Sequence, residues 1–382
     1  MLRTPHPDPE PDLGKTNRIP DARRPRISIV IKALNEERNI AAAIESAIVA
    51  LAGLEGEIIL ADCLSTDRTV AIAREYPVAI VRLERADDRS CGAGAQLGYQ
   101  YSRGEFICLM DGDMRLCEGF VAAAIRCLEE NPRLAGVGGL IIECEKENLE
   151  FVKRRESGDP SQKPGVVKRL DCGGLYRRAA IETVGYLADR NLHGAEELEL
   201  GARLNAHGWT LVRIDRAGIE HDGHAGSAYR LLLRRLTSGM ALASGEVLRG
   251  TIGRRHFRFV VQGSRSFAVG IAVQLWWLCL LSIPFLGLGR LSAALCELAT
   301  LIAPFAFMSL RCGSIRMGLY SVAAWNVCAL AMWPGFLRRR IPPTEWIKSR
   351  ALQQAPSLTP SVVGVPLVSL DGLDGRSRRR LS

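Results

Sequence analysis

Three long apolar segments lie in the C-terminal part of the chain, and they argue against a purely soluble globular fold. Phe267 to Leu288 runs for 22 residues without a charge, and Met317 to Leu337 runs for 21. A helix needs about 20 apolar residues to cross the hydrocarbon core of a bilayer, so both segments are long enough. Leu291 to Leu310 has 20 residues but includes Glu297 and Pro304. Spanning, re-entrant and interfacial placements all stay open for this middle segment.

Charge is distributed unevenly along the chain. The net charge is +9, yet residues 1–224 carry 30 Lys and Arg against 36 Asp and Glu, whereas residues 225–382 carry 20 against 5. The basic excess gathers in Arg230 to Arg265 and in Arg338 to Arg380, on either side of the apolar segments. Such patches suit a nucleic acid or an anionic membrane surface. Because apolar segments lie between them, we expect a membrane partner and no nucleic acid.

The other compositional features indicate a reducing compartment. The 11 cysteines are scattered without a CxxC pair, which argues against a disulfide framework and against a zinc site. Residues 1–25 are rich in proline and charge and lack the apolar core of a signal peptide. This stretch is therefore expected to be a disordered arm.

Residues 26–224 alternate between short apolar runs and helical patterns, which predicts an α/β domain with a mostly parallel sheet flanked by helices. Residues 143–165 are charged and contain Pro and Gly, so we expect a mobile loop there. The runs expected to be strands are Arg26 to Ile31, Glu57 to Ala61, Val78 to Leu83, Phe106 to Met110, Ala135 to Ile142, Lys168 to Leu175 and Thr210 to Ile214.

Two carboxylates stand directly after the fourth of these strands, in Asp111-Gly112-Asp113. Open α/β sheets bind their ligands at the carboxyl ends of the strands. Asp-x-Asp is a plausible clamp for Mg²⁺ or Mn²⁺, which take oxygen ligands and keep positions open for phosphate. The alternative is a turn in which Asp113 only caps the helix expected over Cys117 to Glu130.

Other polar side chains follow the earlier strands and would meet the Asp pair at the same edge of the sheet. Asn35 and Glu36 follow the first strand, Asp62 ends the second, and Arg89 follows the third. Simple turn or cap roles are the alternative for Asn35 and Asp62. Gly92 to Gly98 is spaced GxGxxxG and does not follow the first strand, which disfavours a dinucleotide-binding loop but leaves close approach to a phosphate or sugar open.

Four motifs in this order resemble the inverting family 2 glycosyltransferases of GT-A fold, over roughly Arg26 to Asp222. The motifs are Ala33-Leu34-Asn35-Glu36, Asp62 with Ser65-Thr66-Asp67, Gly94 to Gly98 leading through Gly104-Glu105 into Asp111-Gly112-Asp113, and Glu196 to Leu204. Cys63 and Leu64 depart from the family's DDGSTD segment, and Glu replaces both Asp residues of its ED-x-D-L-x-x-RL helix.

The resemblance implies roles for individual residues. Glu197, at the family's base position, is the preferred general base, with Glu196 as the second choice. Asp113 and Asp111 would hold a divalent metal, Mg²⁺ or Mn²⁺. The remaining members of the nucleotide-sugar site would be Asn35, Glu36, Asp62 and Arg89 together with Asp111. His221 or His224 is a candidate further ligand, although a structural histidine is the more common case. Arg203 is expected to pair with one of the helix acids or with phosphate.

The expected protein is therefore a membrane-anchored, metal-dependent glycosyltransferase with a GT-A-type catalytic domain and a C-terminal helical membrane region. It would move a sugar from a nucleotide-diphosphate donor to a hydroxyl of a membrane lipid or lipid-linked glycan, with inversion, in envelope or extracellular polysaccharide or glycolipid synthesis. The alternatives are a processive polysaccharide synthase, although Gln262 to Ser266 lacks the Trp of a QxxRW motif, a nucleotidyltransferase of related fold, and a non-enzymatic scaffold.

The expected organisation places the protein in the cell (inner) membrane, multi-pass, with a cytoplasmic catalytic domain. Two crossings, with Leu291 to Leu310 re-entrant or interfacial, keep both basic flanks inside and are preferred to three. The expected parts are a disordered arm 1–25, a catalytic domain 26–224, a basic amphipathic juxtamembrane segment 225–266, a membrane region 267–337 of two or three helices, and a basic, disordered tail 338–382.

Overall fold

The computed structural model of this chain describes residues 24–145, 148–149, 152, 160–171, 173–223 and 226–354. The predicted arm, apart from its last residues, and the end of the predicted tail lie outside the described residues. So do residues 146–147, 150–151 and 153–159 of the loop predicted between 143 and 165.

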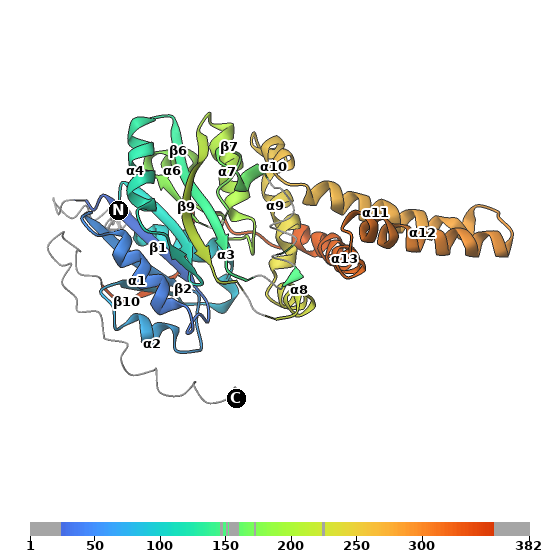
Figure 1. Ribbon diagram of the computed structural model, residues 1–382, viewed down its shortest axis with the longest axis horizontal. Helices are drawn as coiled ribbons and strands as arrows, with labels where there is room; N and C mark the ends of the chain where they lie inside the picture. The colour runs from blue at the N-terminus through green and yellow to red at the C-terminus, as the bar shows by residue number, and fades with distance from the viewer. Residues whose placement is uncertain are drawn as a thin grey trace, which may run out of the picture.

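The fold is built on one ten-stranded mixed sheet, in the order β10-β3-β2-β1-β4-β8-β6-β9-β5, with β7 paired to β9 (Figure 1). The neighbours β3, β2, β1 and β4 are all parallel, as the strand and helix alternation predicts. The strands are β1 Ile27–Ala33, β2 Gly56–Asp62, β3 Ala79–Leu83, β4 Phe106–Asp111, β5 Met114–Leu116, β6 Leu134–Glu143, β7 Gly165–Val167, β8 Gly174–Arg177, β9 Thr210–His221 and β10 Ser349–Gln353.

Helices cover both faces of this sheet, because the parallel strands are apolar on both sides. Alternate residues of β1 point to opposite faces, so that Ile29 and Ile31 join one core cluster and Val30 joins another. The first face is covered by α1 Ile40–Ala50, α2 Thr69–Ala73 and α4 Phe120–Glu130. The second is covered by α3 Cys91–Tyr101, α6 Arg178–Val184 and α7 Glu196–Ala206.

Two predicted strands have different limits in the structure. The run Lys168 to Leu175 was expected to be one strand, but its neighbourhood holds the short strands β7 and β8 with a non-strand connection between them. The last strand, β9, continues seven residues past Ile214 to His221. It extends because β6 pairs with it from Thr210 to His221 and β5 pairs with its end on the other side, so partners are available along its whole length.

The glycines from Gly92 to Gly98 lie inside the helix α3 and serve packing. A Cβ at Gly98 would lie 2.2 Å from Val30 Cγ1, and one at Gly92 would lie 2.0 Å from the carbonyl oxygen of Asp189. These small residues therefore let α3 approach the sheet and the loop before α7 closely.

The tail predicted to be disordered from residue 338 is ordered up to residue 354, which corrects that expectation. Strand β10 pairs antiparallel with β3 at the edge of the sheet, and Ile347 is buried against α3. Unpaired strand edges are covered in native proteins, and here the returning chain covers the β3 edge. The charges and prolines of the tail do not indicate this five-residue strand, whose partner is more than 260 residues away in the sequence.

Basic helices connect the sheet to three long apolar helices. The connecting elements are α8 Ala228–Thr237, η3 Met240–Leu242, α9 Ala243–Thr251 and α10 Phe257–Gly263. The apolar helices are α11 Ser266–Ser282 with its 3₁₀ extension η4 Ile283–Phe285, α12 Arg290–Arg311 and α13 Ile315–Leu337. By length and composition each of the three apolar helices is able to cross a membrane, which includes the middle segment that the sequence left open.

The three apolar helices are placed differently. Helices α11 and α12 form a hairpin that projects away from the sheet, and the Trp276 indole N–H donates to the Thr300 carbonyl across it (Figure 1). Helix α13 packs along α8 and α9 and also contacts α11 and α12. Half of its apolar stretch is buried inside the protein, compared with 6% for α12.

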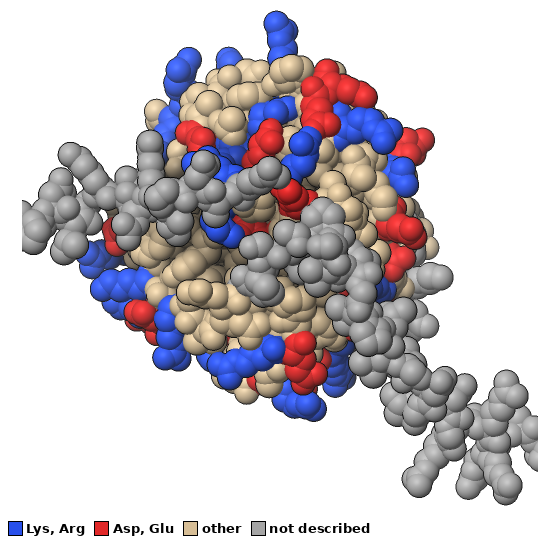
Figure 2. All heavy atoms as spheres, turned by 90° about the vertical axis from the view of Figure 1, so that its left-hand side faces the viewer, with Lys and Arg blue, Asp and Glu red and all other residues tan. Residues whose placement is uncertain are grey.

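The face of the molecule opposite the projecting hairpin carries a mixture of basic and acidic side chains (Figure 2). The described part of that face shows no large single-sign patch of the kind that a nucleic-acid duplex requires. The mixed charge of this face agrees with the sequence, which places the basic excess in the C-terminal part of the chain.

Candidate active site

The candidate site lies at the carboxyl ends of β1 and β4, where the strand order reverses. Chain order runs from β1 outwards to β2 and β3, and then returns to β4 on the other side of β1. Ligand crevices of open α/β sheets form at this kind of switch point. In the parallel register Lys32 is level with Asp111, so the end of β1 and the Asp pair are direct neighbours.

Lys32 forms the centre of the site. Its Nζ lies 3.1 Å from Asp111 Oδ1 and forms a close ion pair with Glu196 Oε1. Burial by itself lowers the pKa of Lys32, but the charges of Asp111, Glu196 and Glu197 outweigh it and raise that pKa well above its usual value. Lys32 is therefore a fixed cation that joins the Asp-Gly-Asp turn to the start of α7.

The two glutamates at the start of α7 have different surroundings. Glu196 is buried and bonded to Lys32, whereas Glu197 is half-buried and has no hydrogen bond or ion pair within the described residues. Burial, followed by the charge of Glu196, raises the pKa of Glu197 to about 8. Of the pair, Glu197 is thus the carboxylate that is open to a reacting group.

Asp113 faces a histidine on β9. His221 Nε2 lies 3.5 Å from Asp113 Oδ2, and His221 Nδ1 lies 2.7 Å from Glu143 Oε2 at the end of β6. Burial lowers the pKa of His221, but the hydrogen bonds to Asp113 and Glu143 outweigh it and raise the pKa to about 9. His221 is therefore protonated at neutral pH and would have to lose its proton to bind a metal. The other candidate, His224, lies outside the described residues.

Glu36 lies beside the Asp-Gly-Asp turn. Burial, followed by the charge of Asp113, raises the pKa of Glu36 to about 7, and the Asn39 amide donates to its carboxylate over 3.0 Å. Gly112 makes this approach possible, since a Cβ there would lie 2.9 Å from Glu36 Cγ. Three carboxylates from two strand ends thus converge, namely Glu36, Asp111 and Asp113.

Asn35 joins the first loop to the second. Its side-chain oxygen accepts from the Thr66 amide over 2.8 Å, and its own amide donates to Ser65 Oγ over 2.9 Å. In the structure Asn35 therefore builds the crevice wall by tying together the loops that follow β1 and β2.

Asp62 and Arg89 are also engaged by protein groups. Asp62 is fully buried, forms an ion pair with Arg82 over 3.1 Å, and accepts from the Ser65 amide. Arg89 donates to the Leu64 carbonyl over 3.4 Å. Both residues thus shape the loop after β2.

Backbone strain is concentrated in the loops around the crevice. Among the described residues, the non-glycine residues with positive φ are Asn35, Leu64 and Ala195, at 59°, 67° and 61°. A left-handed conformation costs an L-residue about 1–2 kcal/mol, so the surrounding contacts must hold it. All three positions lie in loops that carry predicted site residues.

The residues present fit a divalent cation that also binds the substrate. The described residues contain no preformed group of three or more metal-ligating side chains. Magnesium-type sites in phosphate-transferring proteins commonly use one or two carboxylates together with substrate phosphates. Burial raises the pKa of Asp111, Lys32 opposes this shift, and the charge of Asp113 adds to it. The repulsion between the two carboxylates is the kind that a cation relieves, and Asp111 and Asp113 are the residues that would hold it.

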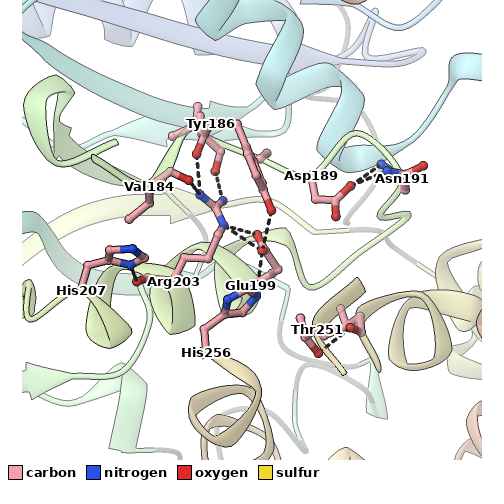
Figure 3. Close-up of polar contacts among 12 residues, drawn as sticks. Val184, Tyr186, Asp189, Asn191, Glu199, Arg203, His207, Thr251 and His256 are labelled. Carbon is pink, nitrogen blue, oxygen red and sulfur yellow. Dashed lines mark hydrogen bonds and ion pairs between the residues drawn. The ribbon is translucent and has the colours of Figure 1, made fainter. Parts of the chain in front are cut away.

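The rest of α7 is locked by a buried ion pair (Figure 3). Arg203 Nε donates to both carboxylate oxygens of Glu199 at 2.8 and 2.9 Å, and its other nitrogens donate to the carbonyls of Val184, Tyr186 and Leu187. Arg203 therefore pairs with a helix acid, the first of the two partners that the sequence allowed. The pair fixes the orientation of α7 against the loop that precedes it.

We expect the replacement of Arg203 by methionine to destabilise the protein strongly. Glu199 and Arg203 are only 2% and 3% exposed, and removing one partner of a buried pair typically costs about 3–5 kcal/mol. The measurement is the free energy of unfolding of the detergent-solubilised chain.

Arg85→Met is the matched control, because the Arg85 and Asp87 side chains are 59% and 87% exposed and such pairs contribute about 0–1 kcal/mol. Equal stability losses in the two variants would contradict a structural role for the Glu199–Arg203 pair.

Lys32 and Glu143 are the members of this arrangement that the sequence did not single out. Lys32 followed an expected strand and Glu143 began an expected loop, so neither position looked unusual. The signal for Lys32 was a lysine at the end of an otherwise apolar buried strand, Ile27–Ala33. A charge is rarely placed there without a partner.

Comparison with known proteins agrees with this architecture. Residues 28–185 match the family model described as glycosyl transferase family 2. EpsE of Bacillus subtilis (strain 168), whose name makes it a candidate glycosyltransferase, is 26% identical over 205 residues, which are 50% of this chain and 71% of EpsE.

Two solved structures are similar to this chain, and the first of them has the same fold. The mannosyltransferase PcManGT from Pyrobaculum calidifontis, in complex with GDP-Man and Mn²⁺, has a TM-score of 0.54 and 16% identity over 82% of this chain and 88% of that one. The crystal structure of S. aureus TarS has a TM-score of 0.44 and 16% identity. The match covers 63% of this chain and only 45% of the TarS chain.

The family match extends from β1 to the end of α6 and so includes both strands that carry the crevice. The likeness to PcManGT, at this identity, concerns the fold. Residues 28–185 of the chain therefore resemble glycosyl transferase family 2, and the fold is of the GT-A type.

Proposed function

We propose that this glycosyltransferase transfers a sugar from a nucleoside-diphosphate donor to a hydroxyl of a membrane lipid or lipid-linked glycan, with inversion at the anomeric carbon. The observation that carries the proposal is the cluster of charges formed by Asp111, Asp113, Glu197 and Lys32 at the carboxyl ends of β1 and β4, in a chain with helices long and apolar enough to cross a membrane.

The chain's own residues have complementary parts in the proposed reaction. Glu197 accepts the proton of the acceptor hydroxyl as that oxygen attacks the anomeric carbon and the bond to the diphosphate breaks. Attack from the face opposite the leaving group inverts the anomeric centre. Lys32 holds Glu196 and Asp111 in place. Asp111 and Asp113 would hold a divalent cation, which when bound offsets the charge of the departing diphosphate.

The donor class is supported by the proteins that share the fold. PcManGT was solved with GDP-Man and Mn²⁺, and TarS was solved with UDP-GlcNAc. Both ligands are nucleoside-diphosphate sugars. A donor of this chemical class, together with Mn²⁺ or Mg²⁺, is accordingly proposed here.

The test is a panel of sugar nucleotides assayed for nucleoside-diphosphate release by membranes containing the protein. We expect release to depend on added Mn²⁺ or Mg²⁺ and on an acceptor in the membrane. Release of pyrophosphate instead would favour a nucleotidyltransferase, and a long polymer product would favour a processive synthase. Absence of any metal-dependent nucleotide binding would favour a non-enzymatic scaffold.

We further propose that α11 and α12 cross the inner membrane as a hairpin, while α13 lies along the cytoplasmic face. Both ends of the apolar region contact the catalytic domain: Phe267 packs in a cluster with Leu198, and Arg338 bonds to His193. The number of crossings between these points is then even. An even number of crossings is also what the sequence favoured. The two crossings are assigned here to α11 and α12.

The charges around the hairpin support this arrangement. Arg290 stands at the tip between α11 and α12, whereas Arg311, Arg316 and the Arg338 to Arg340 cluster all stay on the catalytic side. Cytoplasmic loops carry the excess of Lys and Arg. The exposed side of α13 presents Leu330, Trp333 and Leu337, which suits a helix lying at the lipid interface.

Reporter fusions test this topology. We expect alkaline phosphatase inserted after Gly287, at the hairpin tip, to be active, and the same enzyme fused after Ser382 to be inactive. A fluorescent protein after Ser382 is the positive control for a cytoplasmic end. Active phosphatase after Ser382 would contradict an even number of crossings.

A further inference from the structure

The loop that leads into α7, Asp189 to Ala195, is held by the parts of the chain that surround the apolar helices. It directly precedes Glu196 and Glu197. Four of its side chains bond to residues beyond 337, and one of these, His193, bonds also to α9. The start of the base-bearing helix is thus anchored from the membrane side of the molecule.

Glu246 of α9 is the main anchor. It is 2% exposed, and its two carboxylate oxygens each lie 2.9 Å from a His193 nitrogen, one from the backbone amide and one from ring Nδ1. Arg338, at the end of α13, completes the cluster with Nη1 at 3.1 Å from His193 Nε2 and 3.4 Å from Glu246. The geometry fits a His193 tautomer that donates from Nδ1 to Glu246 and accepts at Nε2 from Arg338.

Residues that follow Arg338 add further ties to the same loop. The Asn191 side chain exchanges two hydrogen bonds with the backbone of Ile341, both at 2.8 Å. Asp189 pairs with Arg340, and Arg190 donates to the carbonyl of Glu345. The segment that follows α13 is therefore bonded to several residues of the loop from Asp189 to Ala195.

The end of this loop is a strained turn. Ala195 has a φ of 61°, a left-handed conformation that alanine rarely adopts, and it is the residue from which α7 starts. Such a turn persists only where its surroundings hold it. The bonds to His193, two residues earlier, are among the contacts that hold it.

We propose that Glu246 and Arg338 are positioning residues that set the direction in which α7 presents Glu197, so that the seating of α13 against α9 controls catalytic competence. This rests on the proposed function, since it assigns the base to α7. It makes the apolar part of the chain a component of the active enzyme in addition to its role as an anchor.

Helix α13 is in close contact with α9 at a position that can be altered without touching the loop. A Cβ at Gly245 would lie 1.9 Å from the Met332 carbonyl oxygen and 2.6 Å from the Phe336 nitrogen. Because both are backbone atoms, Gly245→Ala must push α13 away from α9. A Cβ at Gly289, in the hairpin tip, would meet nothing within 4 Å.

The experiment compares Glu246→Gln, Arg338→Met and Gly245→Ala with the wild-type full-length chain in membranes. We expect kcat to fall by about 10²-fold in each, as a misplaced catalytic group typically costs. The donor KM and the dissociation constant of the nucleoside diphosphate should stay within about twofold, because Lys32 and the Asp pair are untouched. Arg338→Lys should restore part of kcat. Arg339→Met, with an exposed side chain outside this cluster, and Gly289→Ala are the matched controls.

The results separate this inference from the proposed function. An active wild type with unchanged kcat in all three variants overturns the positioning role alone. Parallel losses of kcat, nucleotide affinity and melting temperature also overturn it, because they indicate general unfolding. If Gly245→Ala does not fold, the kcat values of Glu246→Gln and Arg338→Met still test the positioning role. A wild-type chain that releases no nucleoside diphosphate from any donor overturns the proposed function and this inference with it.

Discussion

Replacing Asp113 with alanine is expected to reduce metal-dependent turnover by about 10²–10⁴-fold, because a bound cation supplies several kcal/mol of charge stabilisation and each tenfold corresponds to about 1.4 kcal/mol. Asp113 is buried at the crevice beside Glu36, and its carboxylate is one of the two that would hold the cation. The measurements are nucleoside-diphosphate release over a range of Mn²⁺ concentrations and direct Mn²⁺ binding by electron paramagnetic resonance.

Two control variants make this result specific. Asp215→Ala removes an exposed carboxylate from β9 and should change neither measurement. His221→Asn tests whether Asp113 serves only to hold that histidine, 3.5 Å away, in which case both variants would lose the same activity. Near wild-type turnover of Asp113→Ala in Mn²⁺ would rule out the metal assignment.

Glu197→Gln is expected to lower kcat by about 10²–10⁴-fold, the usual contribution of a general base. Donor binding should be nearly intact, because a missing base is felt in the transition state and not in the ground state. Glu196→Gln is the matched comparison on the same turn. It removes the charge that pairs with Lys32, so donor binding should change in that variant as well. A loss of donor affinity with unchanged kcat in Glu197→Gln would move the base to another residue.

The pH dependence gives a second readout for Glu197. Its pKa is raised to about 8, and only the ionised carboxylate accepts a proton. The wild-type kcat/KM should therefore rise with pH up to about 8 and then level off, since this parameter reports groups of the free enzyme. The residual activity of Glu197→Gln should lack that rise. An identical pH profile in both proteins would contradict the assignment.

The strand ends and their carboxylates were readable from the sequence because they depend on local patterns. Ile27–Ala33 and Phe106–Asp111 are largely apolar runs with a charged residue at or next to their last position, and such runs form buried parallel strands. The placement of Asp111 and Asp113 follows from that pattern. The length of the apolar segments is also a local property, and it fixed which helices are long enough to cross a membrane.

The partners of these residues depended on contacts between segments distant in the chain, which no local pattern encodes. Lys32 meets Glu196 across 164 residues, and His221 meets Glu143 across 78. The preference for Glu197 over Glu196 as the open carboxylate follows from the first of these contacts. The position of α13 follows from the fit of Gly245 and Gly335 against backbone atoms. Strand β10 forms only because β3 offers an unpaired edge.

The sequence by itself thus determined the α/β class, the edge of the sheet where the site lies, the acidic chemistry of that site and the presence of membrane-length helices. Hydrophobic periodicity and chain connectivity are sufficient for these features. Three features follow from the tertiary structure alone. They are the choice of the glutamate that pairs with Lys32, the path of the chain after Leu337, and the anchoring of the loop before α7 from the membrane side. Each of these depends on side-chain packing and charge pairing across the fold, because the free energy of such contacts exists only once distant segments have been brought together.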